Sequence, residues 1–203
     1  NLIELILEKD EVLPIDVSTI YVTNEIINKI SSLDNPSKVM GLCKMNDNKE
    51  VTGNKILLLD GVQDPGNLGT IIRSSLAFNV DTIVTSLDTV DLYNPKVLRS
   101  TQGMIFHLNI VNMDLTEAIT KLKKEEYPIY GTKVEYGSDV STLPKKDRRK
   151  YALVMGNEGN GISSEVSALC DRFLYIDMND KVESLNVAVA TSILLYELNK
   201  NVD

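Results

Sequence analysis

Residues 151–161 read Tyr-Ala-Leu-Val-Met-Gly-Asn-Glu-Gly-Asn-Gly, and this stretch predicts the class of the fold. Its apolar first half stops at a segment that contains Gly156, Gly159, Gly161 and one acid, Glu158. A short apolar run bounded by turn residues is typical of a strand buried in an α/β sheet. Glycine lets a ligand approach the main chain closely, and crevices beyond the carboxyl ends of such strands commonly bind ligands. An ordinary strand-to-helix turn would look the same, so this stretch alone leaves both interpretations open.

The spacing of the glycines narrows the kind of ligand. It is G-x-x-G-x-G, which differs from the dinucleotide fingerprint G-x-G-x-x-G and from a phosphate loop with Gly-Lys-Ser/Thr. We therefore expect a ligand that is not held by the phosphates of a nucleotide.

Composition sets further bounds. The chain has 203 residues, of which 43% are hydrophobic and 25% charged, as in ordinary soluble globular proteins. No apolar run approaches the roughly 20 residues needed to cross a bilayer, so we expect no membrane association. Cys43, Cys170 and the single His107 lack metal-ligand spacing, so we expect no metal site and a reducing, cytoplasmic location. The net charge of −8 argues against nucleic-acid binding over the whole surface but allows a local basic patch.

The order of the elements predicts two domains. Residues 1–47 read as a small α/β piece, with strands at 20–22 and 38–43 flanking one helix. A polar, glycine-containing linker is predicted at 48–54. From residue 55 to 203, strands alternate with helices, which predicts an α/β domain with a mainly parallel sheet.

The first strand of this second domain, 56–59, runs into a polar loop at 60–67. Asn67 is of the type that caps helix N-termini, and we expect it to begin the helix that contains Arg73. By residue type alone, Arg73 would be a solvated or salt-bridged side chain. Asn79 is expected to close the helix in the left-handed conformation.

Two later segments have open interpretations. The only basic cluster, at 145–150, is equally a solvated loop or a phosphate-contacting patch. The last helix, predicted from Ser184 to Asn199, is apolar nearly all round, which favours the core or a dimer interface. A strand carrying His107 is predicted at 105–111.

Three polar loops after strands carry a family resemblance. The segment from Asp60 to Arg73, Asp-Gly-Val-Gln-Asp-Pro-Gly-Asn-Leu-Gly-Thr-Ile-Ile-Arg, resembles the first motif of the SpoU/TrmH family of RNA ribose methyltransferases. Residues 156–161 are similar to its second motif and residues 184–187, Ser-Leu-Asn-Val, to the heart of its third. The motifs occur in the family's order, and each alone would be weak.

The resemblance implies a fold that composition does not. Members of this group, the SPOUT superfamily, have an α/β sheet whose C-terminal segment forms a deep trefoil knot, although knots are exceptional among proteins. The resemblance also implies a homodimer, with S-adenosylmethionine bound in the knot near the interface. The residues that it assigns to the cofactor are Gly156, Asn157, Gly159, Ile176, Met178, Ser184, Leu185 and Asn186.

The implied reaction moves a methyl group to a ribose 2′-hydroxyl in RNA, with Arg73, Asn67 and Glu158 as catalytic residues. The guanidinium group of arginine keeps its proton near neutral pH, so Arg73 cannot accept a proton as a base. We therefore expect Arg73 to position an RNA phosphate and to stabilise negative charge. Asn67 is expected to shape the first-motif turn, and Glu158 either to orient the ribose or its Asn/Arg partners or to cap the next helix. The RNA-binding residues that we expect are Arg73, Lys145, Lys146, Arg148 and Arg149.

The choice of substrate rests on the first domain. Residues 1–47 resemble the later part of the small RNA-binding domain that precedes the catalytic domain in many members, so we expect a partial domain here. That layout favours ribosomal RNA over transfer RNA. A catalytically silent RNA-binding or ribosome-assembly factor on the same fold is the alternative, because Asp177 and residues 179–181 depart from the family's third motif.

Overall fold

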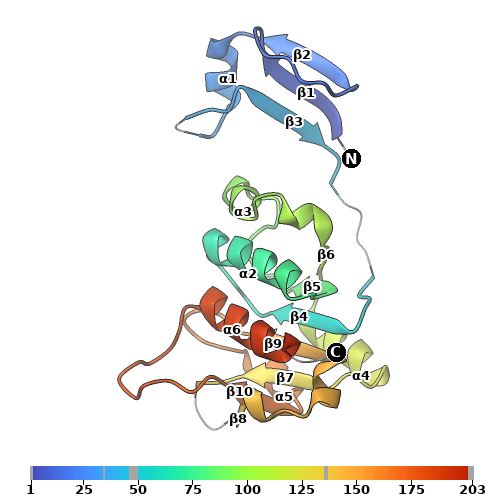
Figure 1. Cartoon of the computed structure of the whole chain (residues 1–203), viewed down its shortest axis with the longest axis vertical. Coiled ribbons are helices and arrows are strands. Elements are labelled where there is room, and N and C mark those ends of the chain that lie inside the picture. The colour runs from blue at the N-terminus through green and yellow to red at the C-terminus, as the bar shows by residue number, and fades with distance from the viewer. Residues whose placement is uncertain (1, 34, 46–49, 135–136, 201–203) are drawn as a thin grey trace. The chain divides into compact units, whose positions relative to one another are not determined.

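Two separate sheets organise the chain, one in each of two units, residues 1–48 and 49–203. The computed structural model describes residues 2–33, 35–45, 50–134 and 137–200 (Figure 1).

The first unit is a three-stranded sheet with one helix. Its strand order is β2-β1-β3, with β1 parallel to β2 and antiparallel to β3. The elements are β1 Leu2–Glu8, β2 Ser18–Val22, α1 Asn24–Ile30 and β3 Val39–Cys43. The central strand β1 was missing from the expected elements, although its alternation buries Leu5 and Leu7 together with Ile27 of the helix.

The second unit is built on a seven-stranded sheet in which every pairing is parallel. The strand order is β6-β5-β4-β9-β7-β10-β8. The strands are β4 Lys55–Leu59, β5 Thr82–Thr85, β6 Asn109–Asn112, β7 Ile129–Thr132, β8 Ser138–Asp139, β9 Tyr151–Met155 and β10 Arg172–Tyr175. The predicted α/β class with a parallel sheet is confirmed.

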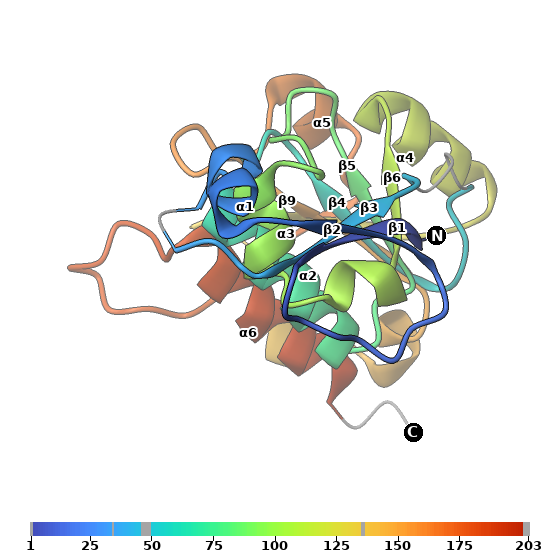
Figure 2. The ribbon, with the colours of Figure 1, turned by 90° about the horizontal axis from the view of Figure 1, so that it is seen from above.

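Helices cover both faces of this sheet. The helices are α2 Pro65–Ala77, α3 Pro95–Ser100, α4 Leu115–Lys124, α5 Ser164–Ala168 and α6 Val187–Asn199, with short 3-10 turns η1 Met104–His107, η2 Val140–Thr142 and η3 Lys145–Arg148. Alternate residues of β4 face opposite cores, Leu57 with α2, α3 and α6 on one side and Leu58 with α4 and α5 on the other. Figure 2 shows α4 and α5 on one side of the strands and α2 and α6 on the other.

Strand β9, the core of 151–161, lies in the middle of the sheet. It is fully buried and pairs with β4 on one side and β7 on the other. The carboxyl ends of parallel neighbours meet at one edge, so the loops after β4 and β9 come together there. Three layers and a central β9 therefore place the first and second motifs side by side.

Two helix starts differ from the expected ones. Helix α2 begins at Pro65, and Asp64 caps it by accepting a hydrogen bond from the Asn67 amide at 2.8 Å. Proline at the first helical position suits the cap before it, so Asp64 takes the role expected of Asn67. Helix α6 begins at Val187 instead of Ser184.

Two further expectations were local. The left-handed Asn79 after α2 is confirmed, with φ of 58°. His107 lies on the η1 turn and not on a strand, because the strand β6 starts only at Asn109.

The predicted linker at 48–54 is only partly a linker. Residues 48 and 49 lie outside the described residues, but 50–54 are bonded to the second unit. Thr52 exchanges hydrogen bonds with Thr82, whose hydroxyl donates to the Thr52 carbonyl at 2.6 Å. The carboxylate of Asp81 accepts from the amides of Asn54 and Lys55 at 2.7 and 2.9 Å.

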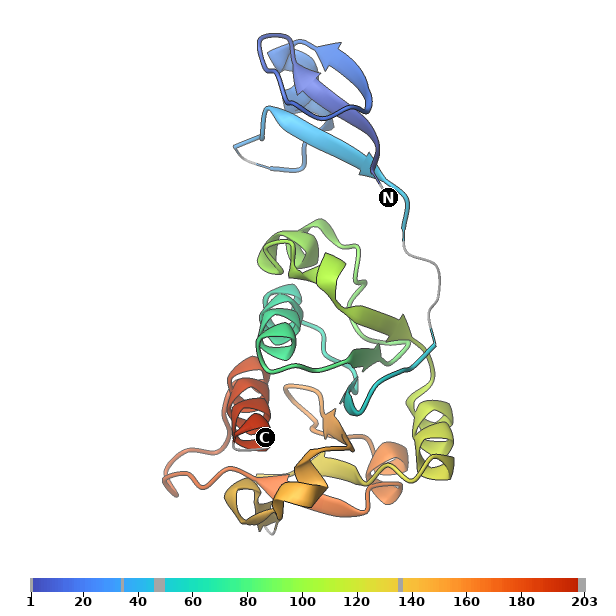
Figure 3. The same ribbon diagram turned by 45° about the vertical axis from the view of Figure 1, so that its right-hand side comes forward.

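The C-terminal helix α6 packs against α2 (Figure 3), and their side chains meet where Ser74 Oγ and Ser192 Oγ are 2.6 Å apart. The trefoil knot implied by the resemblance stays a prediction. Within the described ranges, no helix combines the length and apolarity needed to cross a membrane.

Candidate functional site

Main-chain and side-chain hydrogen bonds fasten the loops after β4 and β9 to each other. The Asn157 side chain donates to the Gly61 carbonyl at 2.7 Å. In the other direction, the Asp60 carboxylate accepts from the Ser163 amide at 2.7 Å, at the start of α5. Gly61 has φ of +69°, a conformation that favours glycine. The first and second motifs thus form one wall.

The second motif is a tight closed turn. Asn157 and Gly161 exchange two main-chain hydrogen bonds of 2.9 Å, and the Asn157 side chain accepts from the amides of Gly159 and Asn160. A Cβ on Gly156 would overlap the main chain of Gly161, so only glycine fits there. Asn157 therefore shapes this loop as well as lining it.

Glu158, Asn67 and Asn186 connect the three motifs in one chain of hydrogen bonds. Asn186 caps α6, its side-chain oxygen accepting from the amides of Ala188 and Val189. Its amide nitrogen then donates to Asn67 Oδ1 at 2.9 Å, and Asn67 Nδ2 donates to Glu158 Oε1 at 2.9 Å.

The direction of this chain is set by its ends. Main-chain N–H groups can only donate, so they orient the Asn186 amide, which in turn orients Asn67 toward a carboxylate that can only accept. We call Asn186, Asn67 and Glu158 the amide relay.

The Glu158 carboxylate also accepts two long hydrogen bonds, from the amides of Gln63 and Asp64 at 3.4 Å each. Partial burial would raise the pKa of Glu158, but the hydrogen bonds from Asn67 and from main-chain amides outweigh it and lower the pKa. Glu158 thus belongs to the turn before α2, and it does not cap the helix that follows it in sequence.

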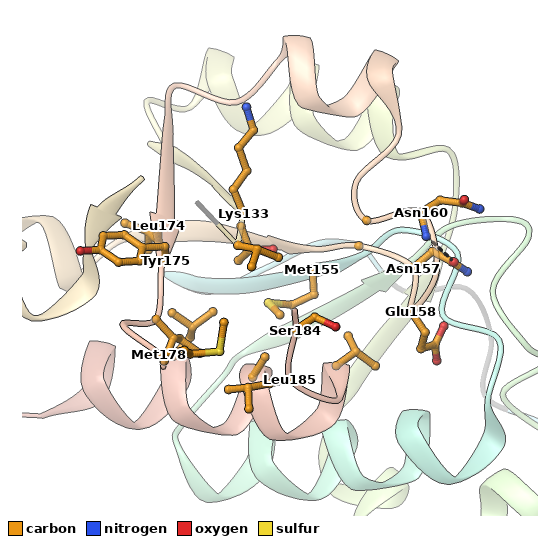
Figure 4. Close-up of a pocket in the computed structure, with 18 of the residues that line it drawn as sticks. Lys133, Met155, Asn157, Glu158, Asn160, Leu174, Tyr175, Met178, Ser184 and Leu185 are labelled. Carbon is orange, nitrogen blue, oxygen red and sulfur yellow. Dashed lines mark hydrogen bonds between the residues drawn. The ribbon is translucent and has the colours of Figure 1, made fainter. Parts of the chain in front are cut away.

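A pocket of about 370 Å³ opens beside the amide relay, within the range of small-molecule sites (Figure 4). It is lined by the predicted residues Gly156, Asn157, Glu158, Gly159, Ile176, Met178, Ser184 and Leu185. Of the residues predicted to hold the cofactor, only Asn186 does not line the pocket. Asn186 instead belongs to the amide relay, where it donates to Asn67.

Sequence reasoning missed more than half of the residues that line the pocket. Thr132, the last residue of β7, and Lys133 and Val134 after it line the pocket, as do Met155, Leu174, Tyr175 and apolar residues of α6. Strand β7 neighbours β9 in the sheet, and that order of strands cannot be read from a single sequence. The side chain of Lys133 points away from the pocket, and its ammonium lies 3.8 Å from the ring centroid of Phe173 (Figure 4).

Arg73 stands apart from the relay. It is exposed in the middle of α2, six residues after Asn67, or about 9 Å along the helix axis. Among the described residues, nothing forms an ion pair or hydrogen bond with its side chain. An exposed, unpaired guanidinium remains available to an incoming anion.

The basic cluster lies elsewhere. Residues 145–149 precede the amino end of β9, at the sheet edge opposite the pocket, and Lys145, Lys146 and Arg149 are exposed. Arg148 differs, because it is only 8% exposed and its guanidinium donates to the carbonyls of four residues: Val140, Ser141, Leu143 and Glu197. The guanidinium is buried and these bonds occupy four of its five N–H groups, so we leave Arg148 out of the RNA-contacting residues.

The fold and the pocket define a class of α/β protein with a small-molecule-sized pocket, lined by loops and apolar side chains, at the carboxyl ends of its parallel strands. Within the described residues, no group of three or more His, Cys, Asp or Glu could hold a metal ion. The sequence model of the SpoU rRNA Methylase family matches residues 54–196, and the chain belongs to that family.

Several relatives bear this out. A Bacillus subtilis protein named 23S rRNA (guanosine(2553)-2′-O)-methyltransferase RlmP is 37% identical over 203 residues, which cover 98% of this chain and 81% of that protein. An uncharacterised tRNA/rRNA methyltransferase of Borreliella burgdorferi is 32% identical, over 73% of this chain and 64% of its own length. The crystal structure of an AdoMet-bound rRNA methyltransferase from Sinorhizobium meliloti superimposes with a TM-score of 0.83 and 27% identity, covering 98% of this chain and 80% of that one.

Proposed function

We propose that the protein is an S-adenosylmethionine-dependent methyltransferase that methylates a ribose 2′-hydroxyl in RNA, and that its substrate is ribosomal RNA in preference to transfer RNA. The observation that carries the proposal is the amide relay, which joins all three family motifs at the rim of one pocket. The name of the Bacillus subtilis relative supports ribosomal RNA.

The pocket suits the cofactor in its chemistry. Apolar side chains such as Leu174 and Leu194 can cover an adenine ring, and the rim offers polar groups but no phosphate-binding loop. The main-chain groups of Met178 and Leu185 make no hydrogen bond within the described chain, so they are free to bind polar edges. The cofactor has no phosphate, which agrees with the glycine spacing of the second motif.

The proposed roles follow from position. When bound, the cofactor supplies an electrophilic methyl group on its sulfonium. The protein must align the ribose hydroxyl with that methyl and favour its alkoxide character. As the new O–CH₃ bond formed, the S–CH₃ bond would break, a neutral thioether would leave and the hydroxyl proton would pass to solvent water. Arg73 binds an RNA phosphate and stabilises developing negative charge, because its pKa is too high for a base.

We assign the amide relay a holding role. Its side chains are bonded to one another and to main-chain amides, with Glu158 accepting three N–H groups. Glu158 is therefore a positioning residue that keeps Asn67 and Asn186 in place, and the mechanism needs neither a carboxylate base nor a metal.

We also propose a homodimer. Helix α6 has an exposed apolar stripe. Val189 is 48% exposed and Tyr196 is 50% exposed, and because they lie seven residues apart they share one face of the helix. Two copies meeting along α6 would bring Arg73 of one copy toward the pocket of the other, because α2 packs beside α6.

Other RNA contacts remain proposals. Lys145, Lys146 and Arg149 are exposed cations at the far edge of the sheet and would bind phosphates remote from the reacting ribose. The first unit would add substrate contacts as an RNA-binding domain. A ribosomal RNA substrate implies a cytoplasmic location.

Two measurements on the full chain test the function. Isothermal titration calorimetry should detect S-adenosylmethionine binding, and the protein should place one 2′-O-methyl mark on 23S rRNA transcribed in vitro. Failure to bind S-adenosylmethionine would refute the proposal that the protein is a methyltransferase. RNA binding without methyl transfer would favour the silent assembly factor, for which the acidic third-motif loop is the supporting feature.

A further inference from the structure

One stretch of this acidic chain contains no acid. Residues 92–113 lack Asp and Glu, although the chain carries 29 of them, and they include Lys96, Arg99 and His107. A local excess of positive charge in a protein of net charge −8 marks a surface for an anionic partner.

The stretch contains two short helices, and both pack against α2. Helix α3 and the η1 turn are joined through Gln102 and Gly103, both left-handed, with φ of 50° and 83°. By helical rise the two span about 9 Å and about 8 Å, so the segment is a surface of a few nucleotides. Helix α3 and the η1 turn are held near each other because both pack against α2.

The side chains of this segment divide into two sets. Val97, Thr101 and Ile105 are buried. Lys96, Arg99, Gln102, Phe106 and His107 are exposed, and Phe106 leaves 70% of its area open.

The exposed cations have no acidic partner. Neither Lys96 nor Arg99 forms an ion pair or a side-chain hydrogen bond with the residues that the structure describes. On α4, by contrast, Lys121 pairs with Glu117 at 2.7 Å and Lys123 with Asp171 at 2.7 Å. Unpaired cations and an exposed aromatic ring, here on two elements that both pack against α2, are the combination that binds unpaired nucleotides, by phosphate contact and base stacking.

This surface adjoins the proposed active site. Ser100 Oγ donates to the Pro65 carbonyl at 3.1 Å, and a Cβ on Gly69 would overlap Ser100. Helix α3 is thus seated against the first turns of α2, which carry Asn67. Figure 3 shows α6, α2 and α3 in one row on the same face of the sheet.

We propose that Lys96, Arg99 and Phe106 form a second RNA-contacting surface, which holds unpaired nucleotides next to the methylated ribose. The proposal rests on the proposed function and deepens it, since it names the surface that receives the RNA. Lys96 and Arg99 bind backbone phosphates, and Phe106 stacks on a base. A second copy of this chain is a poorer occupant, because two copies would bring the same unpaired cations together.

The test is equilibrium binding of in vitro transcribed Bacillus subtilis 23S rRNA to the full-length protein, across a range of salt concentrations. Lys96→Glu and Arg99→Glu should each weaken binding and lower the slope of log K against log salt by about 0.7–0.9, one phosphate contact. Phe106→Ala should weaken binding roughly fivefold or more without changing that slope. Unchanged RNA affinity in all three variants would overturn the proposal.

Lys124→Glu is the matched control. It makes the same charge change at another exposed, unpaired lysine, on α4, which covers the opposite face of the sheet. If Lys124→Glu weakens RNA binding as much as Lys96→Glu does, the effect comes from the net charge of the protein, and the proposed RNA-contacting surface is refuted.

Two further measurements distinguish a failure of this proposal from a failure of the proposed function. Cofactor affinity by calorimetry should stay unchanged in every variant, and sedimentation should show an unchanged oligomeric state. A variant that dissociates an oligomer would identify the surface as a contact between copies and overturn the proposal. If the unaltered protein binds neither RNA nor cofactor, the proposed function itself fails; if it methylates RNA and the variants do so equally well, only this surface fails.

Discussion

At the scale of single residues, Glu158 shows how hydrogen bonds decide a role. Desolvation by the surrounding protein would raise its pKa, but three N–H groups converge on its carboxylate and lower the pKa instead. A carboxyl whose pKa is lowered by folding stabilises the protein above its unfolded pKa, and that contribution is lost as the pH falls through the folded pKa.

Glu158→Gln should therefore destabilise the protein by about 1 kcal/mol at pH 7, because a glutamine NH₂ cannot accept from donors. Urea unfolding at several pH values checks this. The difference between wild type and variant should vanish at acid pH, where Glu158 is protonated and resembles glutamine. A difference that is independent of pH would contradict the assigned cause.

Arg148 is the second residue whose surroundings decide its role. Its guanidinium ties the carbonyls of 140, 141 and 143 to that of Glu197, in the last turn of α6. Arg148→Met would leave these buried acceptors without a donor and should cost about 3 kcal/mol, lowering Tm by about 6–12 °C.

Differential scanning calorimetry measures this loss, and the neighbouring Arg149→Met provides the control. Arg149 is exposed, so its removal should change stability by no more than about 0.5 kcal/mol. Equal losses of stability in both variants would show that the hydrogen bonds of Arg148 do not stabilise the protein.

At the scale of elements, the N-termini of α2 and α6 are joined through the amide relay. Asn186 caps α6, and Asn67 lies in the first turn of α2. Asn186→Ala should cost about 1 kcal/mol for the lost cap and weaken cofactor binding, because Ser184 and Leu185 lose their anchor.

A double-mutant cycle by chemical unfolding isolates the link between the helices. Asn67→Ala and Asn186→Ala should couple by about 0.5–1 kcal/mol, because the two side chains share a hydrogen bond. Asn94, which caps α3 by accepting from Lys96, makes no bond to Asn67 in the described chain and should add independently. Additive losses for the first pair would rule out the relay as a unit.

The elements also show what sequence can and cannot predict. Continuous apolar runs such as 152–155 predicted the buried parallel strands correctly, because both faces of this sheet are covered. The start of α2 was predicted wrongly, since Asp64 and Asn67 are both good caps and the choice depends on Pro65. The contribution of Lys133 and its neighbours to the pocket was missed, because it depends on β7 pairing with β9, a long-range contact that leaves no local signal.

At the scale of the whole molecule, the pocket joins parts of the chain that are far apart in sequence. Its walls come from the ends of β7, β9 and β10 and from α6. A ligand bound there contacts all of them and must be released before the second unit can unfold. Cofactor binding should therefore stabilise the fold as a whole and not a single loop.

The size of that effect can be stated. At a concentration of S-adenosylmethionine about 100 times its Kd, the second unit should gain about 2.7 kcal/mol, which corresponds to a rise in Tm of roughly 5–10 °C. Ala190 lines the pocket from α6, and Ala190→Leu should reduce the rise by filling space that the cofactor needs. Scanning calorimetry with and without the cofactor measures both. A full rise in Ala190→Leu would mean that the cofactor binds elsewhere, because the stabilisation would then not depend on the space inside this pocket.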